Sequence, residues 1–351
     1  MRIKVVAPFR PFSHDPGVKT VLLGSNLIVQ IFPSLIIFNS TEIFVPLNGP
    51  CKDFTVLNDL ESGKISVSGK TKSGLFRYSL YVQDGSYIAF RIERDALKAI
   101  SEALSKLSFI QKVDDKLFLM PFTSEFIKKT ALERLSFGSH KKQDMFLVRR
   151  RKDLREILPL LFMMGQWITL EYPVDKQETL LGVLEESVQK STRDALEEPF
   201  LDFFCASFSG ILAPRIVDEE YQGFAVPPIK SGSPLILLKE VMKLIRLLFI
   251  KETGFILHIF PKLPSSLHCG RMINVMVFDG AIRMSFEWTK SKLFKVIIRG
   301  VKKIEFTLHL PSEIKTFRLR KTLKEKGVTL NRNTPLTIDE GDMLFLDRFL
   351  H

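Results

Sequence analysis

The sequence predicts an α+β protein in which an N-terminal antiparallel β-domain and a C-terminal β-sandwich flank a helical middle. Three observations support this fold class. Apolar residues alternate with polar ones over roughly the first 93 residues, recur at helical spacing from Asp95 onward, and alternate again after Phe255. A chain of 351 residues has room for two or three domains. We therefore expect domains at 1–94, 95–251 and 252–351.

The clearest local pattern in the first part is a β-hairpin. Leu75–Gln83 and Ser86–Glu93 both alternate, and Asp84-Gly85 joins them. Asp-Gly at this place is typical of a type I′ turn, because both central residues need a positive φ. Shorter strands are expected between glycine, proline and asparagine turns, at Val21–Leu23, Leu27–Ile31, Leu35–Phe38, Glu42–Val45 and Ile65–Gly69. The first part therefore reads as a layered sheet structure.

The middle part is predicted to be helical. Apolar residues repeat every three or four positions in Asp95–Leu107, Ser124–Phe137, Asp153–Met164, Lys176–Leu196 and Pro199–Phe208. A further helix is expected to begin at Ser233-Pro234, which suit an N-cap and a first helical position, and to end at Gly254.

The last part returns to strands. Seven alternating segments are expected to form strands: Phe255–Phe260, Ile273–Phe278, Ile282–Trp288, Leu293–Ile298, Ile304–Leu310, Thr316–Arg320 and Met343–Phe349. Asp279-Gly280 repeats the hairpin signal, and this number of short strands between turn residues indicates a β-sandwich. The alternation places Trp288 with the inward-facing residues, which favours a core position over a stacking role.

Positive charge is concentrated in the same part. Between Lys290 and Arg332 the chain has 13 Lys or Arg and three acidic residues, which gives +10 of the total formal charge of +12. A surface with one sign of charge attracts an anionic ligand or an acidic neighbour. The C-terminal domain is therefore expected to present a basic surface to a polyanion or an acidic protein. Sequence-specific recognition of nucleic acid is not expected, because no zinc-finger or RNP-like motif is present.

Cysteine usage and hydropathy favour a soluble cytoplasmic protein. Cys51, Cys205 and Cys269 are odd in number and far apart, which indicates neither a disulfide framework nor a CxxC metal pair. The longest apolar segments are broken by Pro33 or by charged residues, so no membrane span is expected. No nucleotide, hydrolase, zincin or calcium motif occurs, and no cofactor or metal is expected.

Two polar segments are candidates for ligand binding. Ser136–Glu156 contains His140, Asp144 and Arg151, and arginine offers a forked donor to phosphate or carboxylate. This segment is either an anion-binding loop or a solvated helical surface. Pro214–Gly223 combines three acidic residues (Asp218, Glu219 and Glu220), an aromatic ring and an amide, as a sugar subsite needs. Its candidate residues are Asp218, Glu219, Tyr221 and Gln222. Its acids can form a proton-transfer pair, or the segment is an exposed acidic loop docked on the basic sandwich.

A third group lies nearer the C-terminus, at Leu267–Arg271, where His268 and Arg271 flank Cys269-Gly270. Adjacent residues in an extended segment point in opposite directions, so His268 and Cys269 are poorly placed to share a metal ion. Glu287, at the end of a predicted strand, joins Asp218 and Glu219 as a catalytic candidate. The ligand-binding candidates are His140, Asp144, Arg151, Tyr221, Gln222, His268 and Arg271.

The order of the three parts resembles that of a known group of enzymes. Gly254–Pro264 (GFILHIFPKLP), followed by Gly280–Trp288, is similar to the passage that leads the helical barrel into the last sandwich of inverting glycosidases and phosphorylases with an (α/α)6 barrel. The resemblance implies a carbohydrate-related protein, either a reduced glycosidase-like enzyme or a non-catalytic glycan binder, with its cleft between the helices and the sandwiches. Twelve helices do not fit between Asp95 and Lys251, so at most six or seven are expected and the barrel acid and base need not be present.

Overall fold

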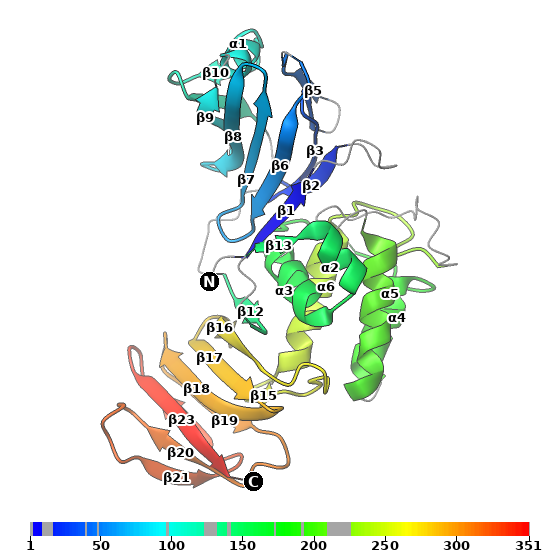
Figure 1. Ribbon diagram of the computed structural model, residues 1–351. Coiled ribbons are helices and arrows are strands. Elements are labelled where there is room, and N and C mark those ends of the chain that lie inside the picture. Colours follow the sequence, from blue (N-terminus) through cyan, green and yellow to red (C-terminus); the bar gives the residue numbers. More distant parts are fainter. Residues whose placement is uncertain are drawn as a thin grey trace.

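The computed structural model describes residues 3–8, 17–38, 41–47, 49–95, 98–122, 132–138, 142–171, 173–190, 193–208 and 226–350. It confirms the predicted α+β class, with N-terminal strands, central helices and C-terminal strands (Figure 1). In the described part of the chain the strands form four sheets, two in each β-domain. These residues include no helix with the length and hydrophobicity that a membrane crossing requires.

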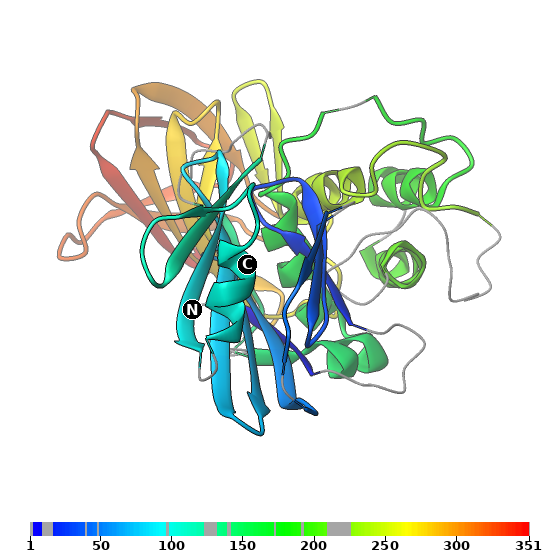
Figure 2. The ribbon, with the colours of Figure 1, turned by 90° about the horizontal axis from the view of Figure 1, so that it is seen from above.

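The N-terminal β-domain contains an eight-stranded and a four-stranded sheet. The larger sheet has the order β10-β11-β9-β8-β7-β6-β1-β13. Its strands are β1 (Lys4–Pro8), β6 (Lys52–Asp59), β7 (Lys64–Thr71), β8 (Gly74–Gln83), β9 (Tyr87–Asp95), β10 (Gln111–Lys112), β11 (Leu117–Pro121) and β13 (Lys142–Asp144). The smaller sheet consists of β2 (Val18–Leu22), β3 (Leu27–Ile31), β4 (Leu35–Phe38) and β5 (Thr41–Phe44). Figure 2 shows both sheets from above.

A shared core holds these two sheets together. Phe38 of β4 meets Phe90 of β9 edge to face, with ring centroids 5.9 Å apart, and both rings are buried. The predicted hairpin is confirmed, since β8 and β9 pair up to Gln83 opposite Tyr87. Asp84, Gly85 and Ser86 lie between them. Asp84 and Gly85 have φ angles of 52° and 73°, as the central residues of a type I′ turn require, and the Ser86 N–H donates to the Gln83 carbonyl at 3.3 Å.

Six α-helices lie in the described part of the chain. They are α1 (Ala99–Ser105), α2 (Met145–Arg151), α3 (Leu154–Gly165), α4 (Leu180–Lys190), α5 (Glu197–Ser207) and α6 (Ile236–Phe249), with a 3-10 turn, η1 (Arg193–Leu196). The predicted helices from Asp95, Asp153, Lys176 and Pro199 are found. The first and third are shorter than expected, the second is shifted by one residue, and the fourth begins two residues earlier, at Glu197. The number of helices in the described residues stays within the expected limit of six or seven.

Two helix predictions are corrected by strand pairing. Arg134–Ser136, within the predicted helix Ser124–Phe137, forms strand β12 against β16; Ser124–Ala131 lies outside the described residues. The helix expected to end at Gly254 stops at Phe249 and continues as strand β14, whose Ile250 pairs with Ile259. Gly254, with φ of 58°, makes the turn of that hairpin instead of ending the helix.

The C-terminal domain is the predicted β-sandwich. Its larger sheet has the order β12-β16-β17-β18-β23-β20-β21, and its smaller sheet has the order β14-β15-β19-β22. Their strands after β12 are β14 (Ile250–Thr253), β15 (Ile256–Ile259), β16 (Gly270–Val277), β17 (Ile282–Thr289), β18 (Lys292–Gly300), β19 (Ile304–His309), β20 (Thr316–Arg320), β21 (Val328–Asn331), β22 (Pro335–Ile338) and β23 (Met343–Leu350). The seven predicted strands are present, and β14, β21 and β22 are additional short ones.

Strands β12 and β13 lie close together in the chain but belong to different β-domains. Strand β12 adds an edge to the C-terminal sheet, where Leu135 pairs with Met272. Strand β13 runs parallel to β1 at the edge of the N-terminal sheet, where Gln143 pairs with Val5. Residues from the predicted helical region therefore complete sheets on both sides (Figure 1). The division at 1–94, 95–251 and 252–351 remains a prediction.

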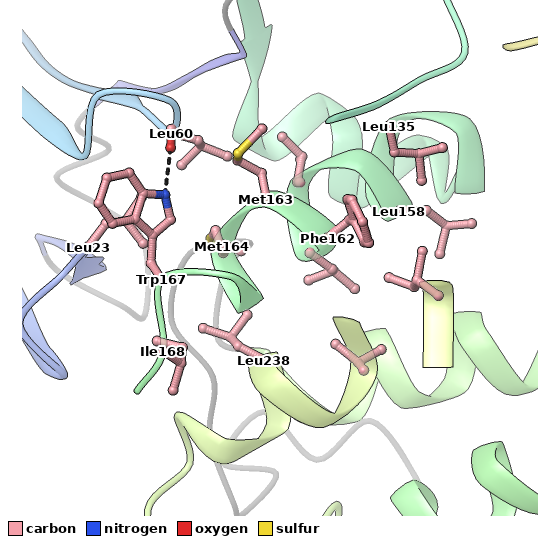
Figure 3. Packing of buried hydrophobic residues seen from close by; sticks show 14 of the residues in the cluster. Leu23, Leu60, Leu135, Leu158, Phe162, Met163, Met164, Trp167, Ile168 and Leu238 are labelled. Atoms are coloured by element: carbon pink, nitrogen blue, oxygen red, sulfur yellow. Dashed lines mark hydrogen bonds between the residues drawn. The ribbon is translucent and has the colours of Figure 1, made fainter. Parts of the chain in front are cut away.

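The buried face of α3 joins the helices to the N-terminal domain. Trp167, just after α3, is 3% exposed, and its indole N–H donates to the Leu60 carbonyl at 2.9 Å (Figure 3). On the other side α3 crosses α6 closely at Gly165. A β-carbon at Gly165 would collide with the Leu238 carbonyl oxygen and with Cβ of Met242. The absence of a side chain at Gly165 is what allows the two helices to approach.

Candidate ligand-binding cleft

A cavity of about 660 Å³ lies at one edge of the seven-stranded sheet. It is lined by residues of β12, β16, β17 and β18 and of the adjoining turns: Ser136, Phe137, Gly138, Cys269, Gly270, Arg271, Glu287, Trp288, Thr289 and Phe294. Its volume falls in the range of small-molecule sites in proteins. We call this cavity the junction cleft, because β12 comes from the segment between the two β-domains.

Strand pairing brings Arg271 and Glu287 together in the junction cleft. Arg271 of β16 lies directly opposite Glu287 of β17, and Ser136 of β12 lies opposite Arg271 on its other side. Their neighbours along the strands, Met272 and Phe286, are buried, so the charged pair faces outward. Neither Arg271 nor Glu287 forms an ion pair with any residue that the structure describes. Both side chains are therefore available to a ligand.

A β-bulge turns an aromatic ring into the same cleft. Glu287 pairs with Lys295 and the next residue, Trp288, pairs with Leu293, which leaves Phe294 as the extra residue of β18. Leu293 is buried, whereas 60% of Phe294 is exposed. The ring of Phe294 thus offers an apolar face beside Arg271 and Glu287.

Trp288 supports the cleft from the core side, which confirms its predicted core position. It is 3% exposed, and its indole N–H donates to the Leu267 carbonyl at 2.8 Å. Its ring centroid lies 5.4 Å from that of Phe249 and 5.3 Å from that of Phe260. Gly270 permits this packing, because a β-carbon there would lie 2.5 Å from the Trp288 ring.

Two of the predicted binding residues, Asp144 and Arg151, form hydrogen bonds within α2 and α3. The Asp144 carboxylate caps α2 by accepting from the backbone N–H groups of Phe146 at 2.9 Å and Leu147 at 3.1 Å. The Arg151 guanidinium donates twice to the buried Glu156 carboxylate, with both distances 2.9 Å. Neither Asp144 nor Arg151 lines the junction cleft.

The remaining candidates are placed as follows. His268 is exposed, and its Nδ1 lies 3.1 Å from the Ser266 carbonyl oxygen, one residue before the cleft-lining Cys269. His140, Asp218, Glu219, Tyr221 and Gln222 lie outside the described residues. Of the ten predicted site residues, the structure therefore brings two together, Arg271 and Glu287.

The chemistry of the cleft is that of binding. Among its described lining residues Glu287 is the single carboxylate, so the acid and base that glycoside hydrolysis needs are not paired there. Glu287 can accept from hydroxyl groups, Arg271 can donate to them, and Phe294 can pack against an apolar face. The described residues contain no group of three or more His, Cys, Asp or Glu that would hold a metal ion.

Most of the cations of the basic C-terminal segment have no acidic partner in the part of the chain that the structure describes. Of the 13 Lys and Arg between Lys290 and Arg332, three form ion pairs with described residues: Lys303 with Asp339, and Arg318 and Arg320 with Asp347. The other ten form none within the described ranges. These ten are Lys290, Lys292, Lys295, Arg299, Lys302, Lys315, Lys321, Lys324, Lys326 and Arg332.

Sequence reasoning missed Phe294 and Ser136. A signal for Phe294 was present, because Leu293-Phe294 puts two apolar residues side by side in an alternating strand and only one of them can face the core. Ser136 carried no signal, since its position depends on the pairing of β12 with the distant β16.

Comparison with known proteins assigns no family to the chain. No protein-family model matches it, and no curated protein matches it. Ten chains of known structure match. One is a GH127 β-L-arabinofuranosidase from Geobacillus stearothermophilus T6, with 13% identity, a TM-score of 0.21, and a match that covers 48% of this chain. The match spans 30% of that enzyme, and a likeness of this size assigns neither its fold nor its activity to the protein described here.

Proposed function

We propose that the protein binds a carbohydrate without cleaving it, and that a sugar residue occupies the junction cleft. The observation that carries this proposal is the convergence of Arg271, Glu287 and the exposed Phe294 on one cavity of about 660 Å³. A sugar presents hydroxyl groups at its edge and C–H groups on its ring face. Unpaired charged side chains satisfy the hydroxyls, and an aromatic ring covers the apolar face.

The absence of cleavage is proposed because the described cleft has a single carboxylate. Glycoside hydrolysis ordinarily uses two carboxyl groups that are separated by ~5–10 Å. A single carboxylate such as Glu287 is enough to accept hydrogen bonds from sugar hydroxyls. It cannot act as both the general acid and the general base of a hydrolysis reaction.

A glycan array followed by isothermal titration calorimetry tests the proposal. We expect at least one glycan to bind the full chain, and we expect Phe294→Ala and Glu287→Gln each to weaken binding roughly tenfold, because each removes about 1–2 kcal/mol of contact. Phe255→Ala is the matched control, since Phe255 is 69% exposed but does not line the junction cleft. The proposal is contradicted if no glycan of the array binds, or if both cleft variants bind as tightly as the parent protein.

The ten cations that form no ion pair with described residues favour a second candidate function, which is the binding of a polyanion through the C-terminal domain. The exposed segment between β20 and β21 carries Lys321, Lys324 and Lys326 within six residues, against Glu325. When binding is driven by such charges, the logarithm of the binding constant falls linearly with the logarithm of the salt concentration, because binding releases counterions from the polyanion.

Heparin binding measured at several salt concentrations tests this second function. We expect the triple charge reversal of Lys321, Lys324 and Lys326 to glutamate to weaken binding and to flatten the salt dependence. Heparin binding that does not respond to salt, or that survives the triple reversal unchanged, contradicts it.

A further inference from the structure

A second, smaller pocket adjoins the junction cleft. Its volume is about 40 Å³, and it shares Ser136, Phe137, Gly138 and Arg271 with the cleft. Its remaining walls come from β12 and β16, from the N-terminal domain including β13, and from α3. We call it the inner pocket. Its polar lining beyond the shared residues consists of Glu61, Arg134, Gln143 and Arg155.

Two polar groups of the inner pocket have no hydrogen-bond partner among the described residues, and they differ in how accessible they are. Gln143 is 6% exposed, and its side-chain amide forms no hydrogen bond with the described residues. The Glu61 Oε1 atom is also buried and has no partner there, although Oε2 of the same carboxylate lies 3.2 Å from Arg134 Nη2. The Gln143 amide keeps some solvent access, whereas Oε1 of Glu61 is enclosed by protein atoms. Polar groups inside proteins are ordinarily paired, so the Gln143 amide calls for a ligand that offers an acceptor.

The charges of the inner pocket favour an anion. Three guanidinium groups line it, and two of them already have acidic partners. Arg134 pairs with Glu61, and Arg155 forms a two-point ion pair with Asp153, with distances of 3.0 and 2.7 Å. Arg271 has no acidic partner among the described residues. Arg271 is therefore the group that a ligand carboxylate would meet, and a planar guanidinium binds carboxylate at two points.

The size of the inner pocket limits what can enter it. A water molecule needs at least ~10–15 Å³ on this measure, so about 40 Å³ accommodates roughly three non-hydrogen atoms. A carboxylate group has this size, and a sugar ring does not. A ring would remain in the larger junction cleft, which Arg271 and Ser136 also line.

We infer that the inner pocket receives the carboxylate of an acidic sugar, so that the glycan bound by this protein contains a uronic acid. The carboxylate lies against Arg271 and accepts from the Gln143 amide. The inference rests on the function proposed above, because it places the ring of that same sugar in the junction cleft.

Calorimetry and saturation-transfer NMR on the full chain test the inference with four probes: D-glucuronate and D-galacturonate, and the uncharged D-glucose and D-galactose. We expect the uronates to bind at least tenfold more tightly than the uncharged sugars, because hydrogen bonds to charged groups are the stronger ones. The methyl ester of glucuronate, which keeps the ring and loses the charge, should behave as an uncharged sugar.

Two variants separate the inner pocket from the cleft. Gln143 lines only the inner pocket, so Gln143→Leu should weaken uronate binding at least fivefold and leave the binding of uncharged sugars unchanged. Glu287 lines only the junction cleft, so Glu287→Gln should weaken the binding of both kinds of sugar. Arg283→Gln is the matched control, because Arg283 belongs to the same sheet and lines neither cavity. Circular dichroism of each variant verifies that it is folded.

The outcomes distinguish the inference from the function beneath it. Equal binding of uronates and uncharged sugars overturns the inference and leaves the carbohydrate function standing. Uronate binding that Gln143→Leu does not weaken in the folded protein also overturns it. If neither these sugars nor any glycan of the array binds, both the inference and the proposed function fail.

Discussion

Arg271 and Glu287 occupy directly opposed positions on β16 and β17, yet no ion pair joins them. Opposite charges at such cross-strand positions contribute only about 0.2–1 kcal/mol to a sheet. Glu287 also lies opposite Lys295 on its other side, so its carboxylate has cations on both neighbouring strands. Both members of the pair can therefore turn toward a ligand with little loss of stability.

The first prediction concerns the stability contribution of this pair. Replacing Glu287 with alanine should change the free energy of unfolding by no more than about 0.5 kcal/mol, because the side chain is exposed and unpaired among the described residues. Urea denaturation followed by circular dichroism measures the change. A loss of several kcal/mol would show that Glu287 has a structural role and would weaken its assignment as a binding group.

The second prediction concerns the crossing of α3 and α6. Gly165→Ala should destabilise the protein by about 1–3 kcal/mol, since the new methyl group meets the Leu238 carbonyl and Met242 and forces the helices apart. Gly138→Ala is the control, because no atom lies within 4 Å of a β-carbon added there. Urea denaturation should give a lower free energy of unfolding for Gly165→Ala than for Gly138→Ala. Equal stability would mean that the two helices have room to separate at no cost.

The third prediction concerns acid unfolding. The hydrogen bond from Arg318 lowers the pKa of the Asp347 carboxyl below its ordinary value of 3.8; partial burial opposes this effect and the charge of Arg320 adds to it. Because the pKa is lowered in the folded state, the ion pairs stabilise the protein above about pH 3.9. This stabilisation is lost as the pH falls through the folded-state pKa.

Asp347→Asn should therefore reduce the free energy of unfolding at pH 7 and flatten its pH dependence below about pH 4. Denaturation curves recorded between roughly pH 5 and pH 2 measure both effects. A variant whose stability follows the same pH curve as the parent would exclude Asp347 as a source of acid sensitivity.

The fourth prediction concerns two neighbouring histidines on the smaller C-terminal sheet. His258 of β15 is paired in register with His309 of β19, and their ring centroids lie 4.8 Å apart. Partial burial, then the His309 ring, then Lys251 lower the pKa of His258 below its ordinary value of 6.5. A base with a lowered folded-state pKa favours folding above its unfolded-state pKa, and this contribution diminishes as the pH falls below about 6.5.

Proton NMR titration of the histidine ring resonances tests this expectation. We expect His258 to titrate below pH 6.5, and its pKa to rise in His309→Gln because a like charge is removed. His268→Gln should leave the His258 titration unchanged, since the exposed His268 is not among the groups that shift it. A His258 pKa at or above 6.5 would contradict the prediction.

Local signals explain which elements could be predicted from the sequence. The β8–β9 hairpin was predictable because the Asp84-Gly85 dipeptide is typical of a type I′ turn, whose central residues both have positive φ. Strand β12 was not, because Arg134–Ser136 carries a pattern compatible with a helix and becomes a strand only by pairing with β16, far along the chain. The helix end predicted at Gly254 was wrong for a related reason, because a glycine at positive φ is as favourable in a hairpin turn as at the end of a helix.

The site could be predicted only in part. Arg271 and Glu287 were recognisable as chemically capable residues, but their opposition depends on the register of β16 and β17. The position of Phe294 depends on a bulge, and that of Gln143 on a parallel pairing with β1. Register, bulges and long-range pairing are set by packing of the whole sheet, so single residues do not reveal them.

The positions of β12 and β13 have a consequence for the order of assembly during protein synthesis. Strand β1 leaves the ribosome before its parallel neighbour β13, which follows only after the other strands of the eight-stranded sheet and α1 have been made. Strand β12 emerges just before β13 and must wait for β16, which follows the last described helix. The nascent chain can therefore complete the eight-stranded sheet before the seven-stranded one, and the walls of the junction cleft can meet only after β16, β17 and β18 have emerged.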